Sequence, residues 1–116
     1  MDTHKNDLSE VSTRALLARR RRAVSRLGDV KGVLSGSLTE QARRCGKAGC
    51  RCAEGAPHGP YAYFAPKPAG RGRLQYVPSG LVATVRARLR RGEQVEETLA
   101  KISAINAELL ARRKLS

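Results

Sequence analysis

Three cysteines and a histidine are the residues of this chain whose types and spacing are suited to metal chemistry. Cys45, Cys50 and Cys52 fall within eight residues, and His58 follows six positions after the last of them. Thiolate sulfur and imidazole nitrogen are the ligands that zinc prefers, and four of them close a tetrahedral structural site. The Gly, Ala, Lys, Arg and Pro residues between them suit a short loop that turns back on itself. The spacing C-x4-C-x-C-x5-H therefore predicts a Cys3His zinc knuckle holding one zinc ion, although it is not a common finger spacing.

Other interpretations of the cysteine cluster stay open at this point. A disulfide would leave one cysteine over, and residues 1–10 are too polar for a secretory signal. We therefore expect a reducing, cytoplasmic location, where clustered cysteines more often bind metal than pair. A redox site or reactive thiol is a second interpretation, but the C-x-x-C spacing typical of such sites is absent. In a third, the cysteines and the loop histidine are unrelated.

Charge is the second informative feature. The chain carries 23 Lys and Arg against 10 Asp and Glu, a formal net charge of +13. Such an excess favours phosphate-rich partners, and no segment approaches transmembrane length, so we expect nucleic acid and no membrane. Most of the cations are Arg, whose planar fork suits phosphate and guanine. Of the two nucleic acids, we expect DNA in preference to RNA. A basic surface that serves solubility alone is the competing interpretation.

The predicted nucleic-acid contacts are basic residues in three places: an N-terminal helix, the knuckle with the hairpin beside it, and a later helix. They are Arg19, Arg20, Arg21, Arg22, Arg43, Arg44, Lys47, Arg51, Lys67, Arg71, Arg73, Arg86 and Arg90. The run Arg19 to Arg22 would wrap right around a helix, so it is either a phosphate-contacting arm or a solvated face.

The elements that position these residues follow from hydrophobic periodicity. An apolar stripe at three- and four-residue steps predicts a helix from Ser9 to Leu27, with Ser9 as its N-cap. Alternating residues predict strands at 61–65 and 73–77, joined by the Pro- and Gly-rich turn 66–72. This β-hairpin would pair Tyr63 with Tyr76 and would be completed to three strands by residues 38–44.

The C-terminal part is predicted to be helical. Ser79 is a plausible cap for a helix whose apolar face covers the hairpin, and Gly92 is expected to break or bend it. That face consists of Leu81, Val82, Val85 and Leu89. From Glu93, a second helix carries the spacing of a short coiled-coil seam. The seam residues are Val95, Thr98, Ile102, Ile105 and Leu109. Residues 93–113 would either form a homodimer or pack on the N-terminal helix of the same chain.

The whole pattern predicts an α+β fold. A zinc-knuckle and β-hairpin module at residues 36–78 would be flanked by an N-terminal arm and basic helix at 1–35. A helical region at 79–116 would follow it.

Several short segments carry a resemblance to a known family. They are Gly36-Ser-Leu-Thr39, Arg44-Cys-Gly-Lys47, Cys50-Arg-Cys52 and Pro57-His-Gly-Pro-Tyr61. The chain resembles small, basic prokaryotic proteins of unknown function with a C-G-K-x-x-C-x-C-x-x-G-x-P-H-G-P-Y signature. The resemblance covers residues 36–110 and implies a loose association with mobile elements, but no established activity. The zinc ligands therefore remain an inference from ligand chemistry.

Our first functional hypothesis is a zinc-stabilised nucleic-acid-binding protein, preferring DNA and serving a mobile element or regulation. The alternative is an oligomeric adaptor, without enzyme activity, that binds another protein through its C-terminal helix. Catalysis is not expected, because the chain has no Gly-rich phosphate loop and only Glu40 and Glu54 lie near the cysteines. Four protein ligands would also leave zinc no open position for water.

Overall fold

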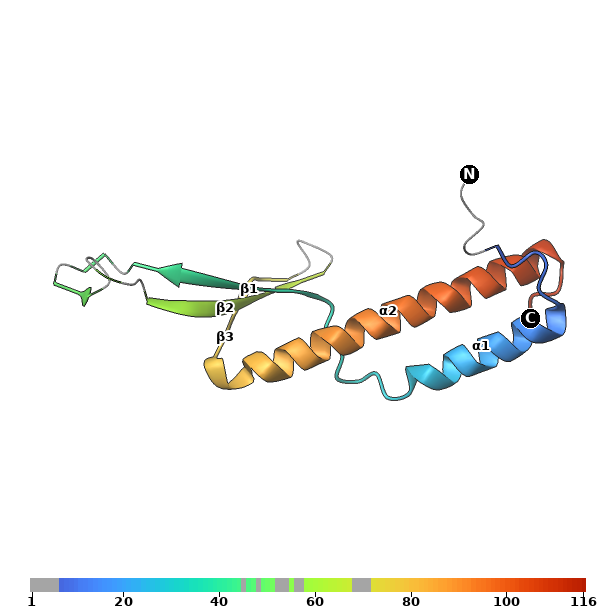
Figure 1. Ribbon diagram of the computed structural model, residues 1–116, viewed down its shortest axis with the longest axis horizontal. Helices are drawn as coiled ribbons and strands as arrows, with labels where there is room; N and C mark the ends of the chain where they lie inside the picture. The colour runs from blue at the N-terminus through green and yellow to red at the C-terminus, as the bar shows by residue number, and fades with distance from the viewer. Residues whose placement is uncertain (1–6, 45, 48, 52–54, 56–57, 68–71) are drawn as a thin grey trace. The chain divides into compact units, whose positions relative to one another are not determined.

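The computed structural model of the protein describes residues 7–44, 46–47, 49–51, 55, 58–67 and 72–116. Its elements in chain order are α1 (Thr13–Leu27), β1 (Gly36–Arg43), β2 (His58–Pro66), β3 (Gln75–Val77), the 3-10 turn η3 (Ser79–Leu81) and α2 (Val82–Ala111) (Figure 1). The predicted α+β class is confirmed. No helix in the described part of the chain is long and apolar enough to cross a membrane.

The chain divides into two compact units. The helical unit comprises Met1–Lys31 with Glu93–Ser116, and the sheet unit comprises Gly32–Gly92. The first turns of α2, up to Gly92, therefore belong to the sheet unit, and its later turns, from Glu93, belong to the helical unit.

The sheet unit is built on three antiparallel strands in the order β1-β2-β3. Successive side chains of a strand point to opposite faces, so one face of this sheet is apolar. Its buried residues are Ala62, Phe64 and Val77, packed against Leu34, Leu38, Val82, Val85 and Leu89. The predicted hairpin and the pairing of Tyr63 with Tyr76 are confirmed. The first turns of α2 cover the apolar face as expected, although Leu81 is 51% exposed and does not contribute.

Gly92 was expected to break or bend the helix, but it lies inside α2, so the predicted break is wrong. The helix runs unbroken from Val82 to Ala111. Gly92 is buried, and a Cβ atom added to it would overlap the carbonyl oxygen of Leu34. The Leu34 N–H also donates to the Arg88 carbonyl oxygen at 3.2 Å. The glycine is therefore explained by the close approach of the segment before β1, and its low helix propensity does not end the helix.

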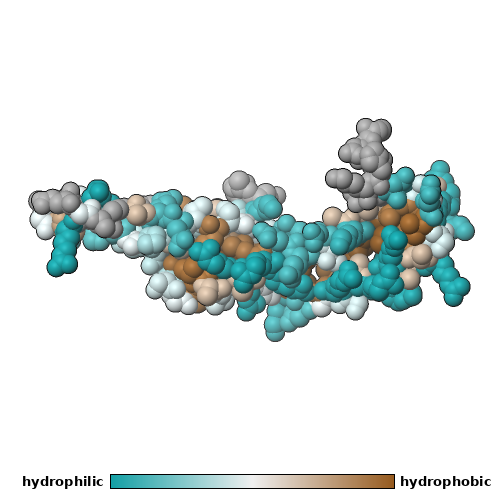
Figure 2. Space-filling model, viewed as in Figure 1, coloured by the Kyte–Doolittle hydropathy of each residue, from teal (hydrophilic) through white to brown (hydrophobic). Residues whose placement is uncertain are grey.

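The helical unit has its own apolar cluster. Leu16 of α1 is buried with Ile105 and Leu109 of α2, and Leu8, Val11 and Leu17 pack around them. The predicted coiled-coil seam thus packs, at Ile105 and Leu109, on the N-terminal helix of the same chain, which was the second of the two expected arrangements. Its most buried residues are consequently unavailable for a coiled coil between two chains. On the face shown in Figure 2, apolar residues gather over the sheet with the beginning of α2, and over the start of α1 with the end of α2.

The start of α1 differs from the prediction. The helix begins at Thr13, and the Ser12 hydroxyl, not that of Ser9, accepts the Ala15 N–H at 3.1 Å as the N-cap. The Ser9 N–H instead donates to Asp7 Oδ1 at 2.9 Å, which lowers the pKa of that carboxyl group. Both serines have the same capping chemistry, so the sequence alone does not separate them.

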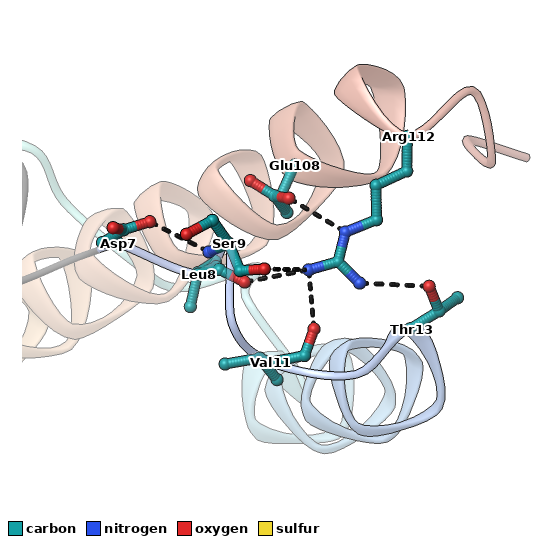
Figure 3. Close-up of polar contacts among 7 residues, drawn as sticks. All are labelled: Asp7, Leu8, Ser9, Val11, Thr13, Glu108 and Arg112. Atoms are coloured by element: carbon teal, nitrogen blue, oxygen red, sulfur yellow. Dashed lines mark hydrogen bonds and ion pairs between the residues drawn. The ribbon is translucent and has the colours of Figure 1, made fainter.

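Arg112 explains why the chain before α1 adopts this turn (Figure 3). Its guanidinium donates to the carbonyl oxygens of Leu8, Ser9 and Val11 at 3.0, 3.3 and 2.6 Å, to Thr13 Oγ1 at 3.1 Å and to Glu108 Oε2 at 2.9 Å. The planar guanidinium fork has enough donors to satisfy several acceptors at once, whereas an ammonium is a point charge. Arg112 therefore binds the N-terminal turn to the end of α2.

Arg112→Lys is expected to lower the free energy of unfolding by about 1–3 kcal/mol, because partly buried acceptors lose charged donors. Chemical denaturation measures this loss. Arg113→Lys is the matched control, since Arg113 is exposed, and it should change stability little. Equal stability of the two variants would contradict the role given to Arg112.

Gly92→Ala is expected to destabilise the protein by about 1–3 kcal/mol through overpacking, although alanine normally gains about 1 kcal/mol in a helix interior. Gly80→Ala is the control, because a Cβ added there meets no atom within 4 Å. Thermal melting of both variants is the measurement. A Gly92→Ala protein as stable as the parent would show that Leu34 does not require the glycine.

Candidate functional site

The loop that holds the cysteines is closed by the pairing of β1 with β2. In the antiparallel register Gln41 lies opposite Tyr61 and Arg43 opposite His58, with an irregularity between Gln41 and Arg43. Arg43 and His58 are thereby paired at one end of the sheet, where the segment between β1 and β2 begins and ends. The Arg44 Nη1 atom also donates to the Gly55 carbonyl oxygen at 2.9 Å.

Gly59 allows the two strands to approach each other beside His58. Its φ angle is +111°, in the region that favours glycine, and an added Cβ would lie 3.0 Å from the Gln41 carbonyl oxygen. A side chain at this position would therefore push β2 away from β1. The glycine of the Pro-His-Gly-Pro segment thus helps to position the histidine.

Cys50 and His58 are brought together by this loop. The Cys50 Sγ and His58 Nε2 atoms are 3.2 Å apart, and both residues are half-buried. With zinc bonds of about 2.3 Å to sulfur and 2.0–2.1 Å to nitrogen, two tetrahedral ligand atoms lie about 3.6 Å apart. The observed separation is close to that value, so this pair suits one edge of a zinc site.

The other two predicted ligands, Cys45 and Cys52, lie outside the described residues. Within the described part of the chain, no group of three or more His, Cys, Asp or Glu side chains is placed to hold a metal ion. The described residues therefore show a thiol–imidazole pair, Cys50 and His58.

The sheet face opposite the apolar one carries all three tyrosines of the chain. Tyr61 and Tyr63 alternate with the buried Ala62 and Phe64 along β2, and Tyr76 lies opposite Tyr63 on β3. The ring centroid of Tyr76 is 6.3 Å from that of Tyr61 and 5.9 Å from that of Tyr63, both edge to face. Tyr76 is 54% exposed, whereas Phe64 is 8% exposed and takes no part in this surface. Successive side chains of a strand point to opposite faces, so Tyr61 and Tyr63 lie on one face and Phe64 on the other. This alternation was the signal in the sequence.

The basic residues of the sheet unit lie near both ends of its strands. Arg44, Lys47 and Arg51 are exposed after β1, and Lys67 and Arg73 are exposed between β2 and β3. On α2, Arg90 is exposed and Arg86 forms an ion pair with Glu40 at 3.2 Å. Arg71 and the side chain of Arg43 lie outside the described part.

The predicted arginine run on α1 is divided by the structure. Arg19, Arg21 and Arg22 are exposed, but Arg20 is half-buried and donates to Asn106 Oδ1 at 2.7 Å. Arg20 therefore has a structural role within the helical unit. Arg19 and Arg22 also line a groove of about 540 Å³ whose floor includes Ala23 and Ile105.

The two carboxylates considered for catalysis are differently placed. Glu40 is held by Arg86 on the apolar side of the sheet, and Glu54 lies outside the described residues. The described geometry therefore brings no carboxylate to the Cys50–His58 pair.

Comparison with known proteins identifies a family over most of this architecture. The family described as Domain of unknown function (DUF6788) matches residues 13–87, from the start of α1 into α2. No curated protein and no solved structure shows significant similarity to the chain. With about two thirds of its length matched, the chain belongs to the DUF6788 family.

Proposed function

We propose that this protein binds nucleic acid, DNA in preference to RNA, through its sheet unit. A zinc ion bound by Cys45, Cys50, Cys52 and His58 stiffens that unit. The phosphate backbone supplies most of the attraction, and the exposed cations around the sheet supply the complementary charge.

The observation that carries the proposal is the uneven distribution of charge between the two units. Residues 32–92 hold eleven Arg and Lys against two Glu, a net charge of +9 out of the total of +13. One of the two acids, Glu40, is paired with Arg86. A basic surface that served solubility alone would have no reason to concentrate on one unit.

The zinc ion has a mechanical role in this proposal. The loop between β1 and β2 carries Lys47 and Arg51, and bonds from its cysteines and His58 to one ion would fix both cations relative to the sheet. A preorganised basic loop loses less conformational entropy on binding than a flexible one. The 3.2 Å separation of Cys50 Sγ and His58 Nε2 supports this assignment.

The adaptor hypothesis has less support. It requires the seam of α2 for a partner, but Ile105 and Leu109 are buried against Leu16 of the same chain.

Cys50→Ser is expected to lower the zinc content of the purified protein and to unfold the sheet unit, because metal binding and folding are coupled in small zinc domains. Elemental mass spectrometry and thermal melting measure the two effects. Arg51→Ala is the neighbouring control and should retain zinc. A Cys50→Ser protein with full zinc content and an unchanged melting temperature would contradict the ligand assignment.

The affinity for DNA is expected to fall steeply with salt, and the sheet unit should account for most of that dependence. Lys47→Ala/Arg51→Ala should reduce the slope of log K against log salt by about 1.4–1.8, because each of the two lost phosphate contacts removes about 0.7–0.9. Arg21→Ala/Arg22→Ala removes the same charge from the helical unit and should change the slope less. Titrations of single-stranded and duplex oligonucleotides at several salt concentrations measure it. No binding of either form at low salt would overturn the proposed function.

A further inference from the structure

We propose that the open sheet face stacks the bases of unpaired nucleotides on Tyr61, Tyr63 and Tyr76, so that the nucleic acid bound there is single-stranded. This inference rests on the proposed function and names the form of nucleic acid that the sheet unit accepts.

The arrangement of the rings suits stacking. Tyr76 meets Tyr61 and Tyr63 edge to face, at an interplanar angle of 65° in both pairs. A face-to-face pair covers one face of each ring, whereas an edge-to-face contact covers a face of only one of the two rings, and Tyr76 is 54% exposed. Aromatic rings on a sheet are the means by which several single-strand-binding folds hold bases, because every base has a π face.

Burial in the core does not account for these tyrosines. The core of the sheet unit is on the opposite face, where Phe64 and Val77 pack against Val82, Val85 and Leu89 of α2. The strand parity places the tyrosines away from that core. Among the described residues of the sheet unit, the helical segment covers only the apolar side.

The other residues of the tyrosine face match nucleobases in their chemistry. In the register of the sheet, Ser37, Thr39 and Gln41 lie opposite Ala65, Tyr63 and Tyr61 and share their face. These are uncharged side chains that donate and accept hydrogen bonds. An acidic peptide would be better served by cations on the face itself, and an aliphatic segment by apolar side chains.

Cations that could contact the phosphates lie at both ends of the sheet. Arg44, Lys47 and Arg51 follow β1 at one end of the sheet, and Lys67 and Arg73 lie at the turn between β2 and β3. A neutral aromatic surface with cations at its ends suits single-stranded nucleic acid. Its bases would face the tyrosine rings and its phosphates would contact the cations. In a duplex the bases are already stacked on one another, so the rings could reach only their edges.

The composition of the chain provides a direct spectroscopic test. The protein has three tyrosines and no tryptophan, and all three tyrosines lie on the proposed surface. Its intrinsic fluorescence therefore reports on this face, and a base stacked on a ring quenches tyrosine emission. Addition of oligo(dT) to the full-length, zinc-loaded protein should quench that emission, whereas a duplex of equal length should not.

Substitution at Tyr76 separates stacking from charge. Tyr76→Leu should weaken oligo(dT) binding by roughly tenfold, the loss of about one stacked base, with the salt dependence unchanged. Tyr76→Phe keeps the ring and should bind like the parent. Gln75→Ala changes the adjacent exposed residue on the other face and should also bind like the parent, and melting curves confirm that all three variants fold.

The outcomes distinguish the two proposals. Binding of oligo(dT) with quenching, weakened by Tyr76→Leu but not by Tyr76→Phe, supports the stacking surface. Binding of single-stranded or duplex DNA without quenching and without an effect of Tyr76→Leu overturns the stacking surface alone. No binding of either form at low salt overturns the proposed function and the stacking surface with it.

Discussion

The antiparallel register between β1 and β2 is the constraint on which the rest of the sheet unit depends. It places Ala62 and Phe64 against α2 and leaves Tyr61 and Tyr63 on the other face. The same pairing closes the loop between the strands, so that Cys50 reaches His58. A shift of one residue would exchange the two faces of β2, because side chains alternate along a strand. One set of backbone hydrogen bonds thus determines the core, the aromatic surface and the thiol–imidazole pair together.

The basic residues have different roles in the two units, which the total net charge does not show. In the helical unit, Arg20 and Arg112 are held by Asn106 and by the turn before α1, so part of its positive charge supports the fold. In the sheet unit, Arg44, Lys47 and Arg51 are exposed on a loop, and the acids are few. Long-range attraction of phosphate depends on the summed field, but a bound strand needs cations beside a surface that accepts its bases. The sheet unit combines exposed cations with an aromatic face, and we propose that a bound strand contacts both.

Hydrophobic periodicity in the sequence predicted those parts of the fold that depend on neighbouring residues of the chain. Alternation predicted β2, β3 and the pairing of Tyr63 with Tyr76, and the three-four spacing predicted the buried stripe of α2. Contacts between distant residues decided the rest. Propensity argues for a break at Gly92, but Leu34 requires the small residue there, and Arg112 explains the turn at Ser9. The structure places Cys50 Sγ 3.2 Å from His58 Nε2, and the four-ligand zinc site stays a prediction. The accessibility of Tyr76 and the burial of Phe64 depended on which side α2 covers.

The central claim is that nucleic acid binds on the open face of the sheet unit. Backbone amide chemical shifts of isotope-labelled protein, followed by NMR while single-stranded DNA is added, test it most directly. The account predicts that the perturbed amides cluster in His58–Pro66, Gln75–Val77 and the loop around Lys47 and Arg51, with small changes in Thr13–Leu27. Perturbations confined to Thr13–Leu27, with the strands unaffected, would contradict it.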